Sequence, residues 1–256
     1  MSGTVHLNIS GHLAELHLDN PDKMNALDLA MLDDLSRHCD VIARDRNIRA
    51  VLLSAAGERA FCTGADILEW GGLDGADFAR FWVRDGHRVF DRLAGLPQPV
   101  IAALNGHAFG GGLELAAACD IRVMTARATL ALPEAGVGIV PGWSGTQRLM
   151  RLLPEPLVKE MALFGRRITA ERALAAGFIA EIADDAPAAA RALIERALTL
   201  SPRATEIAKA MIHAAAGEDR GAMVEMLGAG MISATQDRAE GVAAFAQKRK
   251  PDFKGV

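Results

Sequence analysis

Hydrophobic and polar positions alternate over the first twenty residues and then change to a helical spacing. Residues 4–9 and 13–18 both alternate, and the turn pair Ser10-Gly11 separates them, which predicts a β-hairpin. From Asp28 onward, apolar residues recur every three or four positions to about residue 44. This pattern predicts a helix with Asp28 as its N-cap.

The middle of the chain alternates short apolar runs with helical stripes. The runs predict strands at residues 49–54, 100–104, 121–125 and 129–132. Helices are expected between the first two of these strands and from Gly112 onward. The first carries the stripe Phe78, Phe81, Trp82, Val89 and Leu93, which we interpret as core. This alternation favours an α/β fold over separate α and β domains.

Beyond Gly142 the pattern is mostly helical, with one last strand expected at 178–182. The expected helices cover 146–153, 157–164, 170–175, 188–200, 202–216, 221–233 and a final stretch from 237. The polar run 184–187 indicates a boundary, so we expect a core of residues 1–186 and a helical region of residues 187–256. The helical region is rich in Ala and Met, and its apolar surface predicts oligomerisation.

Composition excludes several classes of protein. The 256 residues are 50% hydrophobic and 23% charged, with a net charge of −4, which disfavours nucleic acid as a partner. No apolar run is long enough for a membrane span. Three distant cysteines, Cys39, Cys62 and Cys119, argue against disulfides and against a metal site. With an N-terminus unlike a signal peptide, they predict a cytoplasmic protein.

A glycine turn in the middle of the chain carries the first candidate chemistry. Gly110 to Gly112 lie between an apolar run and an Ala/Leu helix, so backbone amides there can approach a ligand closely. Glu114 falls in the first helical turn, and Glu134 follows twenty residues later. Two carboxylates beside free amides indicate acid/base chemistry on a polarised carbonyl. A glycine-rich turn with two solvated glutamates is the alternative.

A second turn of the same kind covers residues 61–67. Its amides could join those of the first turn in holding one carbonyl oxygen, while Asp66 is expected to cap a helix. Other motifs fail. The glycines between Gly106 and Gly112 do not have the spacing of a dinucleotide-binding motif. Segment 142–146 is similar to the nucleophile elbow of serine hydrolases, but Thr146 stands where the second glycine is required. His107 is expected to be a hydrogen-bonded structural residue.

Together these segments resemble a known family, in order and over essentially the whole chain. They resemble the enoyl-CoA hydratase/isomerase (crotonase) superfamily in residues 20–21, 25–27, 61–67, 105–114, 119–121, 133–134, 141–142, 145–149, 240–241, 245, 248–250 and 253–254. The resemblance implies an α/β, crotonase-like spiral of ββα units with a C-terminal α-helical trimerisation region. It also implies a homotrimer or a homohexamer built as a dimer of trimers.

The resemblance also assigns roles to residues of this chain. The amides of Ala65 and Gly111 would form an oxyanion hole for the thioester oxygen of an acyl-CoA. Glu114 and Glu134 would flank the Cα–Cβ bond, and the amide of Gly142 would help to position water. The implied CoA-binding residues are Lys23, Met24, Ala26, Ala65, Asp66, Ile67, Leu68 and Gly111, with Phe245 and Lys248 reaching the nucleotide end in the same or a neighbouring subunit.

Two positions depart from the family pattern. Leu68 stands where hydratases often carry a lysine toward CoA, so Lys23, Lys248 and Lys250 are left to meet phosphate charge. Trp143, with Ser144, replaces a pair of small residues. Trp143 either walls the acyl pocket or packs against a neighbouring helix.

The presence of both glutamates favours a hydratase that converts 2-enoyl-CoA to 3-hydroxyacyl-CoA. Such an enzyme is expected to need no metal or other cofactor, since CoA is part of the substrate. Another crotonase reaction on an acyl-CoA (isomerisation, thioester hydrolysis or decarboxylation) is the first alternative. A non-catalytic acyl-CoA-binding protein is the second.

Overall fold

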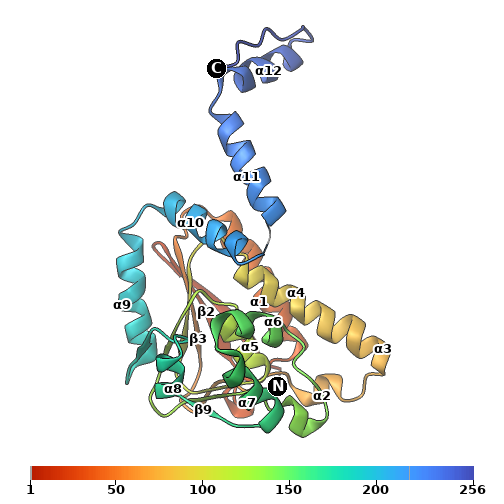
Figure 1. Cartoon of the computed structure of the whole chain (residues 1–256), viewed down its shortest axis with the longest axis vertical. Helices are drawn as coiled ribbons and strands as arrows, with labels where there is room; N and C mark the ends of the chain where they lie inside the picture. Colours follow the sequence, from red (N-terminus) through yellow and green to blue (C-terminus); the bar gives the residue numbers. More distant parts are fainter. Residues whose placement is uncertain (1, 219) are drawn as a thin grey trace. The chain divides into compact units, whose positions relative to one another are not determined.

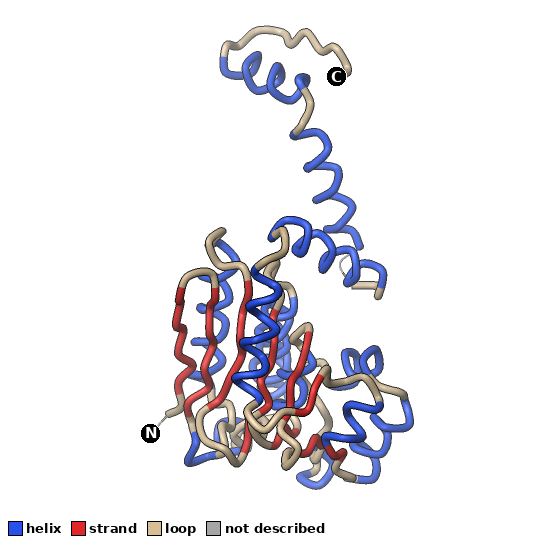
Figure 2. Tube along the Cα trace, turned by 90° about the vertical axis from the view of Figure 1, so that its left-hand side faces the viewer, coloured by secondary structure: helices blue, strands red, loops and turns tan. Residues whose placement is uncertain are grey.

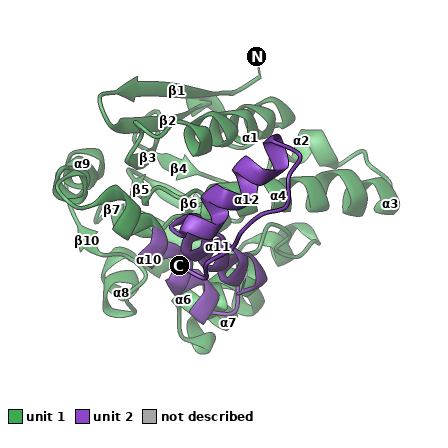
Figure 3. Cartoon of the chain, turned by 90° about the horizontal axis from the view of Figure 1, so that it is seen from above, with its two compact units in different colours: residues 1–206 green, residues 207–256 purple. Residues whose placement is uncertain are grey.

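The computed structural model describes residues 2–218 and 220–256 and divides into two compact units. Residues 1–206 form the first unit and residues 207–256 the second. Figure 1 shows the order of the elements, and Figure 3 colours the two units separately. The candidate site lies wholly within the first unit, which is described first.

The N-terminal hairpin and first helix form as the sequence pattern predicts. β1 (Thr4–Ser10) pairs antiparallel with β2 (Leu13–Asp19). α1 (Leu29–Arg44) begins after Asp28, whose Oδ1 accepts a hydrogen bond from the Met31 amide over 2.9 Å. This cap satisfies one of the free amides at the helix start. Both predictions are confirmed.

A six-stranded sheet forms the first layer of the core (Figure 2). Its order is β1-β2-β3-β5-β7-β10, parallel from β2 onward. The later strands are β3 (Ala50–Ala55), β5 (Val100–Leu104), β7 (Ile121–Met124) and β10 (Glu181–Ile182). Strands β3, β5 and β7 are confirmed. The strand expected at 178–182 is shorter, because only its last two residues pair with β7.

A second sheet has four short strands in the order β4-β6-β8-β9. These are β4 (Ala60–Cys62), β6 (His107–Phe109), β8 (Thr129–Ala131) and β9 (Ile168–Thr169). Only β8, at 129–132, was predicted as a strand, because β4, β6 and β9 are defined by pairing with strands distant in the sequence and not by a local pattern. β4, β6 and β8 are mutually parallel, so their carboxyl ends lie at the same edge.

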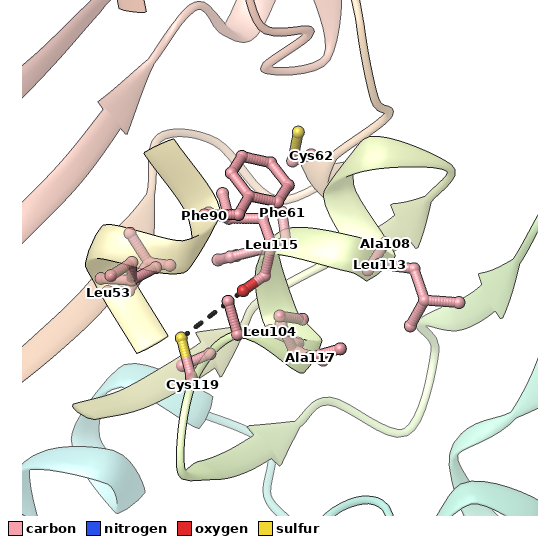
Figure 4. Packing of buried hydrophobic residues seen from close by; sticks show 14 of the residues in the cluster. Leu53, Phe61, Cys62, Phe90, Leu104, Ala108, Leu113, Leu115, Ala117 and Cys119 are labelled. Atoms are coloured by element: carbon pink, nitrogen blue, oxygen red, sulfur yellow. Dashed lines mark hydrogen bonds between the residues drawn. The ribbon is translucent and has the colours of Figure 1, made fainter. Parts of the chain in front are cut away.

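The two sheets are linked as successive turns of a spiral. β3 leads to β4, β5 to β6 and β7 to β8, so each turn places one strand in each sheet. A helical segment follows each pair before the next turn begins. The main core lies inside this spiral, and Figure 4 shows part of it, with Phe61, Phe90 and Leu115 among its buried side chains. The expected ββα spiral is therefore the observed architecture.

The helices of the first unit cover the sheets and carry the loops of the site. They are α2 (Ile67–Trp70), α3 (Gly75–Asp77), α4 (Arg84–Ala94), α5 (Gly111–Ala117), α6 (Gly145–Leu152), α7 (Glu155–Phe164), α8 (Ala170–Ala175) and α9 (Ala186–Leu198). Short 3₁₀ turns cover Pro21–Lys23 and Glu134–Val137. A π-helical turn, Phe78–Val83, joins α3 to α4.

Helix α9 packs on the face of the large sheet that points away from the main core. Ala186, Ala190 and Ile194 pack there against residues that include Leu52 and Ile101. The compact units therefore divide after Glu206, whereas the sequence placed α9 with the C-terminal helices. Strands β3 and β5 are buried along their whole length, on both faces of the sheet. The face that points away from the main core must therefore also be covered, and α9 covers it.

The C-terminal helices are α10 (Pro202–Ala215), which crosses the division between the units, α11 (Arg220–Ser233) and α12 (Gln236–Ala246). All three were predicted within a few residues. Many large apolar side chains of the second unit are exposed, among them Met211, Ile212, Val224, Met231 and Phe245. Among the described residues, no helix is long and apolar enough to cross a membrane.

Candidate active site

The site lies where the parallel strands β4, β6 and β8 end. Gly64 and Ala65 follow β4, Gly110 and Gly111 follow β6, and Glu134 follows β8. Loops beyond the carboxyl ends of neighbouring parallel strands meet at one edge, which is a common place for a ligand. They meet here around a cavity of about 150 Å³. Its wall consists of Thr63, Gly64, Ala65, Ile67, Trp70, Phe78, Trp82, Val83, Gly110, Gly111, Glu114, Pro133, Glu134, Val137, Ile139, Val140, Gly142 and Trp143.

The two glycine turns predicted from the sequence come into contact at this cavity. A Cβ atom on Gly64 would lie 3.1 Å from the amide nitrogen of Gly111. The neighbouring carbonyls of Gly64 and Leu27 are already bonded, to the amides of Leu27 and Asp66 respectively. Within residues 2–218 and 220–256, no protein acceptor bonds the amides of Ala65 or Gly111. Two unpaired amides beside one cavity are suited to a ligand oxygen.

Glu114 is held at the wall of the cavity by two backbone amides. Its Oε1 accepts hydrogen bonds from Trp143 over 2.8 Å and from Gly145 over 2.7 Å. The side chain is 2% exposed, and this burial raises the pKa of Glu114 to about 7. The two amides, at the start of α6, oppose the rise because they favour the ionised form. A carboxylate with a pKa near neutrality can exchange a proton in either direction.

Glu134 lines the same cavity from a 3₁₀ turn after β8. It is 7% exposed, and burial raises its pKa. Its Oε2 is buried without a hydrogen-bond partner in the described part of the chain. Gly110 passes directly beside it, since a Cβ atom there would lie 2.8 Å from Oε1 of Glu134, and Gly110 has a φ of +51°. Both glutamates are thus buried in the cavity wall, which overturns the alternative of two solvated side chains.

Trp143 packs against α4 and the π-helical turn, as one of its two predicted roles requires, and its role as a wall of the acyl pocket stays a prediction. It lines the cavity and is 3% exposed. Its ring packs against Trp82 and Phe90, with centroids 5.3 and 5.2 Å away, and its Nε1 donates to the carbonyl of Trp82 over 3.2 Å. Gly86 leaves room for the indole, because a Cβ atom at that position would lie 2.2 Å from Nε1.

Sequence reasoning missed the aromatic wall of the cavity. Most of the stripe from Phe78 is core as predicted, with Trp82 and Leu93 buried in the main cluster, but Phe81 is 51% exposed. Phe78 and Trp82 also line the cavity. The π-helical turn causes this difference, since its wider spacing rotates successive side chains away from an α-helical stripe. All three tryptophans of the chain, Trp70, Trp82 and Trp143, line this one cavity.

The other predicted CoA-binding residues of the first unit differ in their surroundings. Lys23 Nζ lies 2.5 Å from Oδ2 of Asp66, so its charge is paired within the protein. Asp66 also accepts from the Leu68 amide over 3.0 Å, which confirms it as a helix cap. Leu68 is 83% exposed and Met24 adopts a positive φ. Ala26 is bonded through its carbonyl to Asn20, and Ile67 lines the cavity.

The remaining predicted residues are Gly142, Phe245, Lys248 and His107. Gly142 lines the cavity beside Trp143, and its role with water stays a prediction. Phe245 and Lys248 belong to the second unit, so their contact with CoA also stays a prediction. His107 bonds Thr129 through its Nδ1 and has the structural role expected of it.

Comparisons with known proteins identify the family of the chain. The sequence model described as enoyl-CoA hydratase/isomerase matches residues 8–256. The chain is 40% identical over 249 residues to a putative enoyl-CoA hydratase/isomerase, YngF, of Bacillus subtilis, covering 96% of this chain and 95% of that protein. It is 35% identical to (E)-benzylidenesuccinyl-CoA hydratase of Thauera aromatica, covering 98% and 99%.

A solved structure is also similar. The crystal structure of an enoyl-CoA hydratase from Bacillus anthracis superimposes with a TM-score of 0.81 at 35% identity, covering 99% of this chain and all of that one. The fold is therefore the crotonase fold, with its C-terminal helices. The chain belongs to the enoyl-CoA hydratase/isomerase family.

Proposed function

We propose that this protein is an enoyl-CoA hydratase that adds water across the 2,3-double bond of a 2-enoyl-CoA. The observation that carries the proposal is the pair of buried glutamates, Glu114 and Glu134, in one cavity with two unpaired amides. A pure acyl-CoA-binding protein has no use for two buried carboxylates, which are costly to desolvate. An isomerase requires only one of them.

The amides of Ala65 and Gly111 would hold the thioester oxygen. Water attacks Cβ only when the negative charge that moves onto this oxygen is stabilised, and each fixed donor is worth roughly 10²–10³ in rate. These amides do not have to reorganise during the reaction, because each is fixed in a turn after a strand of the small sheet. They supply the polarisation that the reaction needs, so we propose no metal or redox cofactor.

The two glutamates would divide the proton transfers. Glu114 accepts two amide hydrogen bonds, which favour its ionised form, so it is suited to take a proton from water. Both bonds use Oε1, which leaves Oε2 for the proton. Glu134 has a buried oxygen without a partner, which favours its protonated form, so it is suited to deliver a proton to Cα. Addition then gives 3-hydroxyacyl-CoA.

The direct test of the reaction is loss of the conjugated-enoyl absorbance of crotonyl-CoA, with the product identified as 3-hydroxybutyryl-CoA by mass. Parallel incubations with 3-enoyl-CoA, saturated acyl-CoA and a malonyl-type thioester test isomerase, hydrolase and decarboxylase activity. Dialysis against a chelator should leave hydration unchanged. Turnover of one of the other substrates without hydration would favour the corresponding alternative.

We also propose that the protein assembles as a trimer or a dimer of trimers through its second unit. Exposed apolar side chains such as Met231 (76%) and Phe245 (88%) support this, since a monomer rarely leaves such a surface in water. Light scattering of the full chain measures the assembly. Met231→Glu should reduce it to smaller species if α11 is buried between subunits, whereas Glu225→Gln on the same helix should not.

CoA binding and cellular location are also proposals. Phe245 and Lys248 would reach the nucleotide end of CoA, and Lys23 would meet a phosphate after exchanging its partner Asp66. Lys248→Ala should then raise the KM for the CoA thioester and leave kcat unchanged. We propose a cytoplasmic location, supported by Cys39, Cys62 and Cys119, which are buried and form no disulfide in the described part of the chain. Cell fractionation tests it.

A further inference from the structure

The turn that holds Glu114 has an unusual central residue. Ser144 lies between the two donors, Trp143 and Gly145, and adopts a φ of +78°. Few residues other than glycine adopt this left-handed conformation without support from their surroundings. It turns both flanking amides toward the same oxygen, Oε1 of Glu114. Whatever holds Ser144 in this conformation therefore also holds the carboxylate.

The Ser144 side chain is held by a different helix. Ser144 stands at the N-cap of α6, yet its hydroxyl makes no capping bond. Instead, Oγ lies 3.1 Å from the imidazole nitrogens of His87 on α4. The preceding residue of α4, Gly86, contacts the indole of Trp143. Consecutive residues of α4 thus touch consecutive residues of the turn.

His87 also lies beside an ion pair between Asp91 of α4 and Arg148 of α6. Its Nε2 lies 3.4 Å from Oδ2 of Asp91, one turn further along α4. The other oxygen of Asp91 accepts from Arg148 over 2.5 Å, and Arg148 is a buried residue of α6. These contacts connect His87 to α6. Neither Ser144 nor His87 lines the cavity, so the serine is not a nucleophile for a bound thioester.

We propose that His87 is a positioning residue for Glu114, acting through the Ser144 hydroxyl to fix the two amides that hold the carboxylate. The proposal rests on the proposed function for its effect on rate. Its effect on the carboxylate itself does not depend on which reaction the enzyme performs. The charged groups that face Glu114 from the other elements are Glu134 and Arg148, and neither is altered in the test.

Three single variants test the proposal. Ser144→Ala removes the hydroxyl without changing any charge. His87→Ala removes the imidazole, and His87→Gln removes its possible charge but keeps a group that can hydrogen-bond to Ser144. Arg88→Ala, the next residue on the exposed side of α4, is the matched control. The pKa of Glu114 is read by ¹³C NMR of glutamate-labelled protein, with Glu114→Gln identifying the resonance.

The proposal predicts that Ser144→Ala and His87→Ala raise the pKa of Glu114 by about 0.5–1 unit, because weaker amide bonds stabilise the ionised form less. In the hydration assay both should lower kcat about 3- to 30-fold with little change in KM, as expected when a positioned base is displaced. His87→Gln should keep the pKa of Glu114 and kcat close to their natural values, and Arg88→Ala should change neither quantity. The double variant Ser144→Ala/His87→Ala should be no worse than the poorer single variant.

Three results would overturn the proposal: an unchanged pKa in Ser144→Ala, equal shifts in His87→Ala and His87→Gln, or additive losses in the double variant. If Ser144→Ala does not fold, the comparison of His87→Ala with His87→Gln still decides. If the protein proves not to hydrate enoyl-CoA, the NMR measurement remains valid. Failure of the proposed function is therefore distinguished from failure of this inference.

Discussion

The amide of Gly145 donates to Oε1 of Glu114 over 2.7 Å, and a Cβ atom on Gly145 would lie 2.6 Å from that same oxygen. The residue that holds the carboxylate therefore has no room for a side chain. The first helix of the site, α5, carries Glu114, and a later helix, α6, fixes it.

Gly145→Ala should displace Glu114, since the added methyl group would clash with both the carboxylate and Cγ of that side chain. A displacement of about 1 Å can cost on the order of 10²-fold in rate, and we expect a fall of that size in kcat. Circular dichroism checks the fold. Gly75→Ala, where a Cβ atom meets open space, is the control and should keep full activity. Full activity of Gly145→Ala would show that the contact with Glu114 is not needed.

The pH dependence of stability should reveal the buried Glu114. Its pKa in the folded protein is about 7, above its ordinary value of 4.5, so the folded state binds the proton more tightly than the unfolded state. The contribution of Glu114 to the free energy of unfolding is therefore fully present below about pH 4.5 and is lost as the pH rises toward 7. The loss amounts to about 3 kcal/mol, since one pKa unit corresponds to about 1.4 kcal/mol.

Urea unfolding of the natural protein and of Glu114→Gln at pH 5 and pH 8 measures this effect. The natural protein should lose stability relative to the variant as the pH rises, because the variant cannot ionise at this position. Hydration should show the matching acidic limb, with kcat increasing as the pH rises through about 7 and Glu114 becomes an active base. Equal pH dependence in the two proteins would mean that Glu114 titrates normally.

Trp143→Ala should change both the substrate preference and the stability. The indole lines the cavity and also packs against Trp82 and Phe90, so its loss should cost about 3–5 kcal/mol of unfolding free energy. The enlarged pocket should favour longer or bulkier acyl chains, because each methylene group in an apolar pocket is worth about 1–3 kcal/mol. Ratios of kcat/KM over C4 to C10 substrates test this, and unchanged ratios would leave Trp143 a packing residue.

Much of the first unit could be predicted from the sequence because long periodic patterns determine it. The hairpin before Asp28, the helix after it and the strand Val100–Leu104 are all strongly patterned. The two glycine turns and both glutamates could also be found, since each follows an apolar run. Short strands such as β4 and β6 could not, because pairing with neighbours distant in the sequence defines them.

Other parts of the site depend on contacts that no local pattern contains. The amides that hold Glu114 come from a turn at least twenty-nine residues after it in the sequence. His87 and Ser144, which also contact each other, are fifty-seven residues apart. The aromatic side chains of the cavity wall were not predicted, because the π-helical turn at Phe78–Val83 points them in other directions than an α-helix would. Gly86 was not predicted to matter either, although the indole of Trp143 occupies the space that a side chain at this position would need.

The most direct test of the account compares Glu114→Gln and Glu134→Gln on 2-enoyl-CoA and on 3-enoyl-CoA. Each variant keeps the shape of the side chain but removes a titratable group, so both variants should fold and their CoA affinity should change little. A hydratase uses both groups in each turnover, so either variant should lower hydration by on the order of 10²–10⁴. The double variant should be little worse than the poorer single one, because the two groups act as a unit.

An isomerase would behave differently, since one carboxylate is enough to move a proton between carbons. Glu134→Gln would then abolish activity, while Glu114→Gln would leave conversion of 3-enoyl-CoA to 2-enoyl-CoA largely intact. The proposed hydratase should therefore lose crotonyl-CoA hydration in both single variants. Full hydration by Glu134→Gln would contradict the proposal.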